Sequence, residues 1–171
     1  MASMFQTVIV GVVNVIFMSL AILFVDSVGR KPLLIGGAIG CAISLFSVAI
    51  LSSLNIFGIS TLVFILLFVA SFQFSWGVVT WVFVSEIFPN KIRGQATAIA
   101  VALHWLANLM ISSTFPPLND LFGSMTFAIY GFLSLVSVFF VWKLVPETKG
   151  KTLEELEEIW NKKSSERKEA I

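Results

Sequence analysis

The chain has 171 residues, of which 57% are hydrophobic and 12% are charged, and its formal net charge is +1. Soluble domains carry about 25% charged and about 45–50% apolar residues, so this composition is typical of a membrane protein. The near-neutral charge excludes a protein that binds nucleic acid through a basic surplus. With Cys41 as the single cysteine, a disulfide framework and a cysteine-type metal site are also excluded.

Five apolar runs follow one another along the chain, and each is long enough to cross a bilayer. Their approximate bounds are 5–25, 33–54, 59–84, 95–116 and 122–144. A helix that rises 1.5 Å per residue needs about 20 residues to cross a hydrocarbon core of about 30 Å. The runs do not alternate apolar with polar residues, as the strands of a membrane barrel do. The sequence therefore predicts an all-α polytopic bundle of five transmembrane helices.

The basic residues indicate how the bundle is oriented. Arg30 and Lys31 follow the first run, Lys91 and Arg93 follow the third, and the remaining basic residues lie from Lys143 onward. The connections after the second and fourth runs contain neither Lys nor Arg. Because basic connections stay on the cytoplasmic side, we expect an outside N-terminus and a cytoplasmic C-terminus in a plasma or inner membrane.

The two outside connections carry turn residues. Residues 55–58 connect the second and third runs. Pro116, Pro117, Asn119 and Asp120 follow the fourth run. Since two consecutive prolines do not continue a helix, we expect the fourth helix to end at this pair.

The chain changes character after the fifth run. We expect residues 1–145 to form the membrane bundle and 146–171 to form a cytoplasmic tail. Thr152 and Glu155 have the spacing of a capping box, and apolar residues recur after them at helical spacing. The tail therefore contains a predicted short amphipathic helix over 152–170, placed under the bundle or at the lipid headgroups.

Polar side chains at membrane depth usually face the interior of the bundle and often line a pathway. The candidates for substrate contact are Asn14, Gln73, Trp81, His104, Trp105 and Asn108. Such a set carries amide, imidazole and indole groups without a fixed charge, which suits a neutral polyol better than an ion. Two alternatives remain open: Asn14 could hydrogen-bond between helices, and His104 could relay protons.

Three motifs lie at the predicted cytoplasmic ends of the helices: DSVGRK at 26–31, SEIFPNKIRG at 85–94 and PETKG at 146–150. In this order and spacing they resemble the D/E-x-x-G-R-R/K, S/A-E-x-x-P-x-x-x-R and PETKG motifs of the sugar porter family of the major facilitator superfamily. The resemblance extends from about residue 5 to about residue 160.

The resemblance implies a transporter for a hexose or a pentose that works by alternating access. Members of the family have twelve transmembrane helices in two halves, and the five helices here resemble helices eight to twelve. A missing N-terminal half would then be a partner of this chain, together with membrane lipid. We expect no enzymatic activity, cofactor or metal, because the sequence contains no catalytic constellation and no phosphate-binding loop. Symport and uniport are not separable from these residues.

The resemblance also assigns roles to individual residues. Asn14, Trp81, Trp105 and Asn108 match family positions associated with sugar contact, and Gln73 and His104 match such positions by place. A second set would form salt bridges between helices that close the cytoplasmic side; it comprises Asp26, Arg30, Glu86, Arg93 and Glu147. The alternative is that Lys91 and Arg93 only determine topology.

The third helix resembles the broken, gating helix of the family but lacks its usual proline pair near Trp81. Val78, Val79 and Thr80 occupy that span, so the sequence leaves the sharpness of the bend open. At the level of function, the chain could instead be a truncated, non-transporting protein or a subunit that only associates with another membrane chain. An ion channel is disfavoured, because no ring of acidic residues occurs at membrane depth.

Overall fold

The computed structural model describes residues 2–88 and 92–150, with side chains from Met4 onward. The predicted amphipathic helix over 152–170 lies outside the described residues, as do Pro89 and Lys91. The described part of the chain is helical and contains no strand, which confirms the all-α prediction. In chain order its elements are α1 (Ala2–Val28), α2 (Arg30–Ser53), α3 (Ile59–Phe72), η1 (Gln73–Gly77), α4 (Val78–Ile87), α5 (Arg93–Phe122) and α6 (Met125–Leu144).

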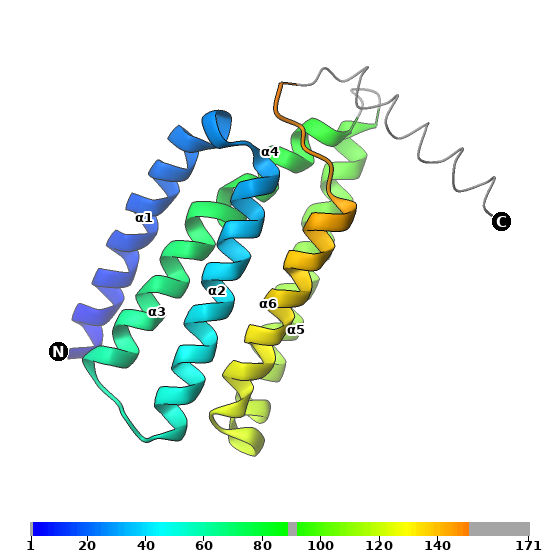
Figure 1. Cartoon of the computed structure of the whole chain (residues 1–171). Helices are drawn as coiled ribbons and strands as arrows, with labels where there is room; N and C mark the ends of the chain where they lie inside the picture. The colour runs from blue at the N-terminus through cyan, green and yellow to red at the C-terminus, as the bar shows by residue number, and fades with distance from the viewer. Residues whose placement is uncertain (1, 89–91, 151–171) are drawn as a thin grey trace.

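Five spans are long and apolar enough to cross a membrane, as predicted, because α3, η1 and α4 together form one span over Ile59–Ile87. The helices run side by side in alternating directions (Figure 1). The junction of α1 with α2, the end of α4 and the end of α6 lie at the same end of the bundle (Figure 1). These are the positions where the sequence places its basic residues.

Helix α2 is the centre of the bundle and packs against both α3 and α6 (Figure 1). Small residues of α2 allow its close approach to α3 and η1. A Cβ added at Gly37 would overlap the side chain of Ser75, and one added at Gly40 would overlap Ser71. Helices in membranes associate through such small-residue contacts. The hydrophobic core contains Val25, Leu33, Leu34, Val79 and Val141.

The prediction that Pro116 and Pro117 end the fourth helix is wrong. Helix α5 continues through both prolines to Phe122. A proline removes one backbone donor but keeps a helical φ, and a transmembrane helix tolerates it where neighbouring groups satisfy the freed carbonyls. The helix ends further along the chain at Gly123, whose φ of +54° is left-handed and whose N–H donates to the Asn119 carbonyl at 2.8 Å.

The third span is interrupted by a π-helical turn rather than by a proline. This turn, η1, covers Gln73–Gly77 and contains one extra residue per turn relative to an α-helix. Two of its side chains bind α2: Ser75 Oγ donates to the Leu33 carbonyl at 2.7 Å, and Trp76 Nε1 donates to the Leu34 carbonyl at 3.0 Å. The extra residue rotates the face that α4 presents, and α4 carries both Trp81 and Glu86.

Candidate functional site

The junction between α1 and α2 places Arg30 at the end of the bundle. Gly29 separates the two helices with a φ of +102°, a conformation that residues with a side chain rarely adopt. A Cβ at this position would also lie 2.9 Å from Glu147 Oε2. Gly29 is therefore required both for its backbone conformation and for the approach of Glu147.

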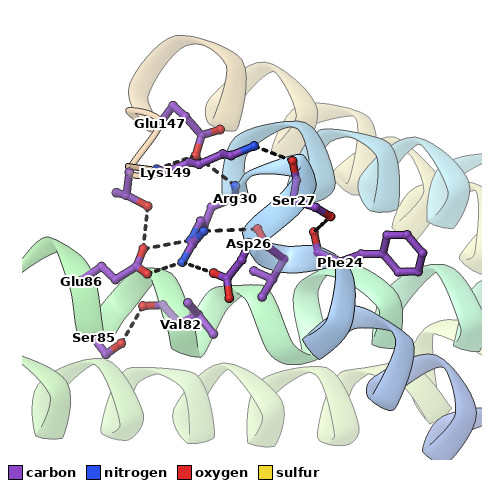
Figure 2. Close-up of polar contacts among 11 residues, drawn as sticks. Phe24, Asp26, Ser27, Arg30, Val82, Ser85, Glu86, Glu147 and Lys149 are labelled. Carbon is purple, nitrogen blue, oxygen red and sulfur yellow. Dashed lines mark hydrogen bonds and ion pairs between the residues drawn. The ribbon is translucent and has the colours of Figure 1, made fainter. Parts of the chain in front are cut away.

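Arg30 is the centre of a charged cluster (Figure 2). Its Nε donates to Glu86 Oε2 at 3.0 Å and its Nη2 to Glu86 Oε1 at 2.5 Å, so the guanidinium and the carboxylate form a bidentate pair between α2 and α4. Nη2 also donates to Asp26 Oδ1 at 2.9 Å, and Nη1 donates to the Val25 carbonyl at 3.2 Å. The side chain of Arg30 is 10% exposed, that of Glu86 is 29% exposed and that of Asp26 is 80% exposed. The pair with Glu86 is therefore the better shielded of the two.

Glu147 caps the N-terminus of α2 from a distant part of the chain. Its carboxylate accepts the backbone N–H groups of Arg30, Lys31 and Lys149, each at 3.0 Å. Partial burial raises the pKa of Glu147, but the backbone donors, including that of Thr148, outweigh burial and lower this pKa below its usual range. The carboxylate also complements the positive end of the α2 dipole.

Two further residues of the PETKG motif make contacts at this end of the bundle. Thr148 is buried, and its Oγ1 donates to Glu86 Oε2 at 2.7 Å. Lys149 Nζ donates to the Ser27 carbonyl in the last turn of α1 (Figure 2). We call Asp26, Arg30, Glu86, Glu147 and Thr148 the closed cluster.

The structure brings four of the five predicted gating residues together and leaves Arg93 apart. Arg93 Nε donates to the Phe88 carbonyl at 3.2 Å, which keeps the guanidinium at the start of α5. Among the described residues, Asp26 and Glu86 form ion pairs with Arg30, and Arg93 forms none. The role of this set as a gate stays a prediction.

A second cluster lies between α4 and α5 and carries no formal charge. The rings of Trp81 and His104 meet edge to face with centroids 5.1 Å apart, and those of His104 and Trp105 with centroids 5.9 Å apart. Asn108 Nδ2 lies 3.0 Å from His104 Nε2 and 3.2 Å from the His104 carbonyl. We call Trp81, His104, Trp105 and Asn108 the open cluster.

The open cluster is accessible because α5 contributes nothing to the core. No residue of α5 is buried, and Trp105 is 67% exposed. His104 and Asn108 are four residues apart and thus lie on one face of the helix. The arrangement combines aromatic surfaces with hydrogen-bond donors and acceptors, the groups that bind uncharged polar molecules.

The other two predicted sugar contacts lie outside the open cluster. Asn14 is partly buried on α1, and Gln73 lies in η1 with its side-chain oxygen over Gly77, where a Cβ would overlap it. Neither residue makes a hydrogen bond to the open cluster in the part of the chain that the structure describes. No group of three or more His, Cys, Asp or Glu within residues 2–88 and 92–150 is arranged to hold a metal ion.

A cavity of about 590 Å³ lies elsewhere, between α2, α3, α5 and α6. Its lining is mostly apolar and includes Phe68, Phe115 and Phe127, together with the hydroxyl-bearing residues Tyr130, Ser134 and Ser137. None of the six predicted sugar contacts lines it. Since a polyol needs several hydrogen-bonding partners, the open cluster is the better candidate site.

The chain matches known proteins over nearly its whole length. The family model described as "Sugar (and other) transporter" matches residues 1–160. The D-xylose-proton symporter of Escherichia coli K12 is 50% identical over 165 residues, which are 92% of this chain and 34% of the symporter. The glucose transport protein of Synechocystis is 42% identical over 166 residues, covering 90% of this chain and 36% of that protein.

Solved structures agree with these relatives. The structure of XylE, the major facilitator superfamily proton:xylose symporter of E. coli, bound to 6-bromo-6-deoxy-D-glucose has a TM-score of 0.86 and 49% sequence identity. The match covers 93% of this chain and 35% of that one. This chain thus spans about a third of the length of the relatives it matches. It is a membrane protein, and it belongs to the sugar porter family of the major facilitator superfamily.

Proposed function

We propose that this chain is the part of a sugar transporter that contributes one wall of the substrate site and one side of a cytoplasmic gate. The substrate is a neutral monosaccharide, a hexose or a pentose, carried by alternating access. Family membership supports this reading, and so do relatives named for xylose and for glucose. The observation that carries it is the exposed, uncharged cluster of Trp81, His104, Trp105 and Asn108.

The open cluster has the chemistry that a sugar needs. The hydroxyl groups of a monosaccharide both donate and accept hydrogen bonds, while its C–H faces pack on aromatic rings. The indoles of Trp81 and Trp105 offer such surfaces, and His104 and Asn108 offer polar partners. Asn14 and Gln73 extend the site along α1 and η1 in this proposal.

The closed cluster acts as the gate in this proposal. Partly exposed ion pairs contribute about 0–1 kcal/mol each, so a network of them holds helix ends together yet opens within a transport cycle. Arg30 and Glu86 form its central pair, Asp26 and Glu147 support it, and Arg93 is available for a partner. The side of the membrane follows from the positive charges: the closed cluster faces the cytoplasm, and the N-terminus faces outward.

The rest of the transporter covers α5. This helix is apolar but unburied, and the relatives are about three times as long as this chain. In the proposed assembly a second transmembrane part packs over α5 and encloses the sugar, and lipid covers the outer surface. Residues 146–171 form the cytoplasmic tail of this assembly.

Replacement of the matched segment of the E. coli D-xylose-proton symporter by this chain tests the proposal. We expect the chimera to take up labelled D-xylose or D-glucose in a saturable way, and the Trp105→Leu chimera to lose most of that uptake. The 171-residue chain reconstituted alone into liposomes serves as a control and is expected to give no saturable uptake.

A well-inserted chimera that takes up neither sugar would contradict the proposal. That outcome would favour a membrane protein that only associates with another chain, for which α5 offers the uncovered face. Uptake by the isolated chain would contradict the part of the proposal that requires a second transmembrane part.

A further inference from the structure

The side-chain amide of Asn108 can be oriented from its neighbours. Its Nδ2 position lies 3.2 Å from the backbone carbonyl of His104, which can only accept a hydrogen bond. The opposite orientation would place two oxygen acceptors against each other. The amide nitrogen therefore faces the carbonyl, and this choice follows from a backbone group whose chemistry is unambiguous.

The orientation of the amide determines the tautomer of His104. The same Nδ2 lies 3.0 Å from His104 Nε2. An amide nitrogen donates and does not accept, so Nε2 must carry a free lone pair, and the imidazole proton resides on Nδ1. Both N–H bonds of Asn108 are thereby directed at His104, one to the ring and one to the carbonyl.

We propose that Asn108 is a positioning residue that holds His104 in the Nδ1–H tautomer. In the part of the chain that the structure describes, Nδ1 has no hydrogen-bond partner, and the His104 side chain is exposed. The pair therefore presents one donor, His104 Nδ1–H, and one acceptor, Asn108 Oδ1. Trp81 and Trp105 flank the ring and restrict its rotation.

This inference deepens the proposed function, on which its ligand rests. One sugar hydroxyl can accept a hydrogen bond from His104 Nδ1–H, and a neighbouring hydroxyl can donate one to Asn108 Oδ1. The pair therefore recognises two hydroxyl groups, one as an acceptor and the other as a donor. The opposite tautomer would present an acceptor from the ring and would lose the contact from Asn108 Nδ2. Asn108 thus determines that the free ring nitrogen of His104 donates a hydrogen bond to the ligand and does not accept one.

The tautomer can be read without any sugar, because His104 is the only histidine of the chain. In the 171-residue chain labelled with ¹⁵N-histidine and reconstituted in lipid, we expect a protonated Nδ1 and an unprotonated Nε2. In Asn108→Leu we expect the Nε2–H form to appear. Thr114→Val is the matched control, because Thr114 Oγ1 makes the same kind of bond to the carbonyl four residues earlier, that of Met110, at 2.7 Å.

A dominant Nε2–H form in the unchanged chain would overturn the proposal, and so would an Asn108→Leu spectrum identical to that of the unchanged chain. Neither readout depends on transport. Failure of sugar uptake in the chimera would therefore count against the proposed function and not against the tautomer.

A double-mutant cycle in the chimera separates positioning from direct sugar contact. We expect Asn108→Leu to raise the KM for sugar uptake about tenfold, because it removes the contact of Oδ1 with the sugar and also releases His104 from its tautomer. In a His104→Gln background, where the amide supplies donor and acceptor without a tautomer, only the Oδ1 contact is lost, and the same substitution should raise KM about threefold. An equal effect in both backgrounds would show that Asn108 acts on the sugar only through Oδ1 and would overturn its positioning role.

Discussion

The closed and open clusters differ in almost every physical respect, although α4 contributes to both. The closed cluster consists of charged groups and helix ends, shielded around Arg30 and connected to α1, α2, α4 and the PETKG segment. The open cluster is uncharged, stands on the unburied helix α5 and is joined mainly by ring contacts. One end of α4 is thus held firmly, while its other end faces an accessible surface.

Because of this difference, we expect the closed cluster to determine the stability of the fold and the open cluster to determine ligand binding. Substitutions in the closed cluster remove hydrogen bonds and ion pairs that connect four segments, so they should act on the folding of the chain. Substitutions in the open cluster remove exposed groups that support little else, so they should act on the ligand. The π-helical turn directly precedes α4, which carries Trp81 and Glu86, and the bonds from Ser75 and Trp76 to α2 connect this part of the third span to the central helix.

Arg30→Met should have the largest effect on stability. It leaves the partly buried Glu86 carboxylate without its bidentate partner, and the loss of a partner by such a charged group costs up to about 3 kcal/mol. Thermal unfolding of the chain in detergent micelles measures this loss. Asp26→Asn is the control and should cost less than about 1 kcal/mol, because Asp26 is exposed. Equal losses would show that Arg30 is not the centre of the cluster.

Gly29→Ala should destabilise the chain by about 2 kcal/mol. Alanine at this position would have to adopt a left-handed backbone conformation, and its Cβ would collide with the Glu147 carboxylate. Gly11→Ala is the matched control, since nothing lies within 4 Å of a Cβ there and the residue is within α1. The control should be neutral or slightly stabilising. A neutral Gly29→Ala, measured by the same unfolding, would contradict the described approach of Glu147.

Trp105→Leu should weaken sugar binding by the chimera about tenfold, or about 1.4 kcal/mol, while its unfolding temperature stays unchanged. Trp105 is exposed, and within the described part of the chain its one ring contact is with His104. Trp142→Leu replaces another exposed indole, which packs on Phe139 outside the open cluster. It should leave binding intact, and a loss of binding in both variants would remove the distinction between the two indoles.

Acidification should have the smallest effect and should act on the closed cluster. Because the folded-state pKa of Glu147 is lowered, its contribution to stability is present above the ordinary glutamate pKa and is lost as the pH falls through the lowered value. Glu147→Gln should flatten this part of the dependence of unfolding temperature on pH. Asp120→Asn, at the opposite end of the bundle, should retain it. Identical curves for Glu147→Gln and the unchanged chain would contradict the capping role.

The sequence predicts the five spans because hydrophobicity and length alone decide which segments cross a bilayer. Their ends depend on local backbone chemistry instead. Pro116 and Pro117 were the strongest turn signal near the end of α5, yet Gly123 ends the helix through its left-handed conformation. The extra residue of η1 has no comparable signal, because it depends on the carbonyls of α2 that receive Ser75 and Trp76.

For the candidate sites, too, the sequence predicts some features, and others depend on contacts between distant residues. Polar residues at membrane depth and the three motifs predict which residues are candidates, but not which of them come into contact. Arg30 pairs with a residue 56 positions away, and Trp81 meets His104 through the packing of α4 on α5. Sequence reasoning missed Thr148, a member of the closed cluster, and Gly29, which allows Glu147 to approach, because neither a hydroxyl group nor a glycine indicates by itself which residue it will contact. Their signal was the motif itself, which places them beside Glu147 and Arg30.

The central claim is that the open cluster binds a sugar, and tryptophan fluorescence tests it most directly. D-xylose and D-glucose are titrated into the purified chimera and into its Trp81→Phe, Trp105→Phe variant, with L-glucose as the control. We expect a saturable change in fluorescence for at least one D-sugar, absent with L-glucose and absent in the double variant. A folded chimera whose fluorescence responds to neither D-sugar, or responds equally in the double variant, would contradict the account.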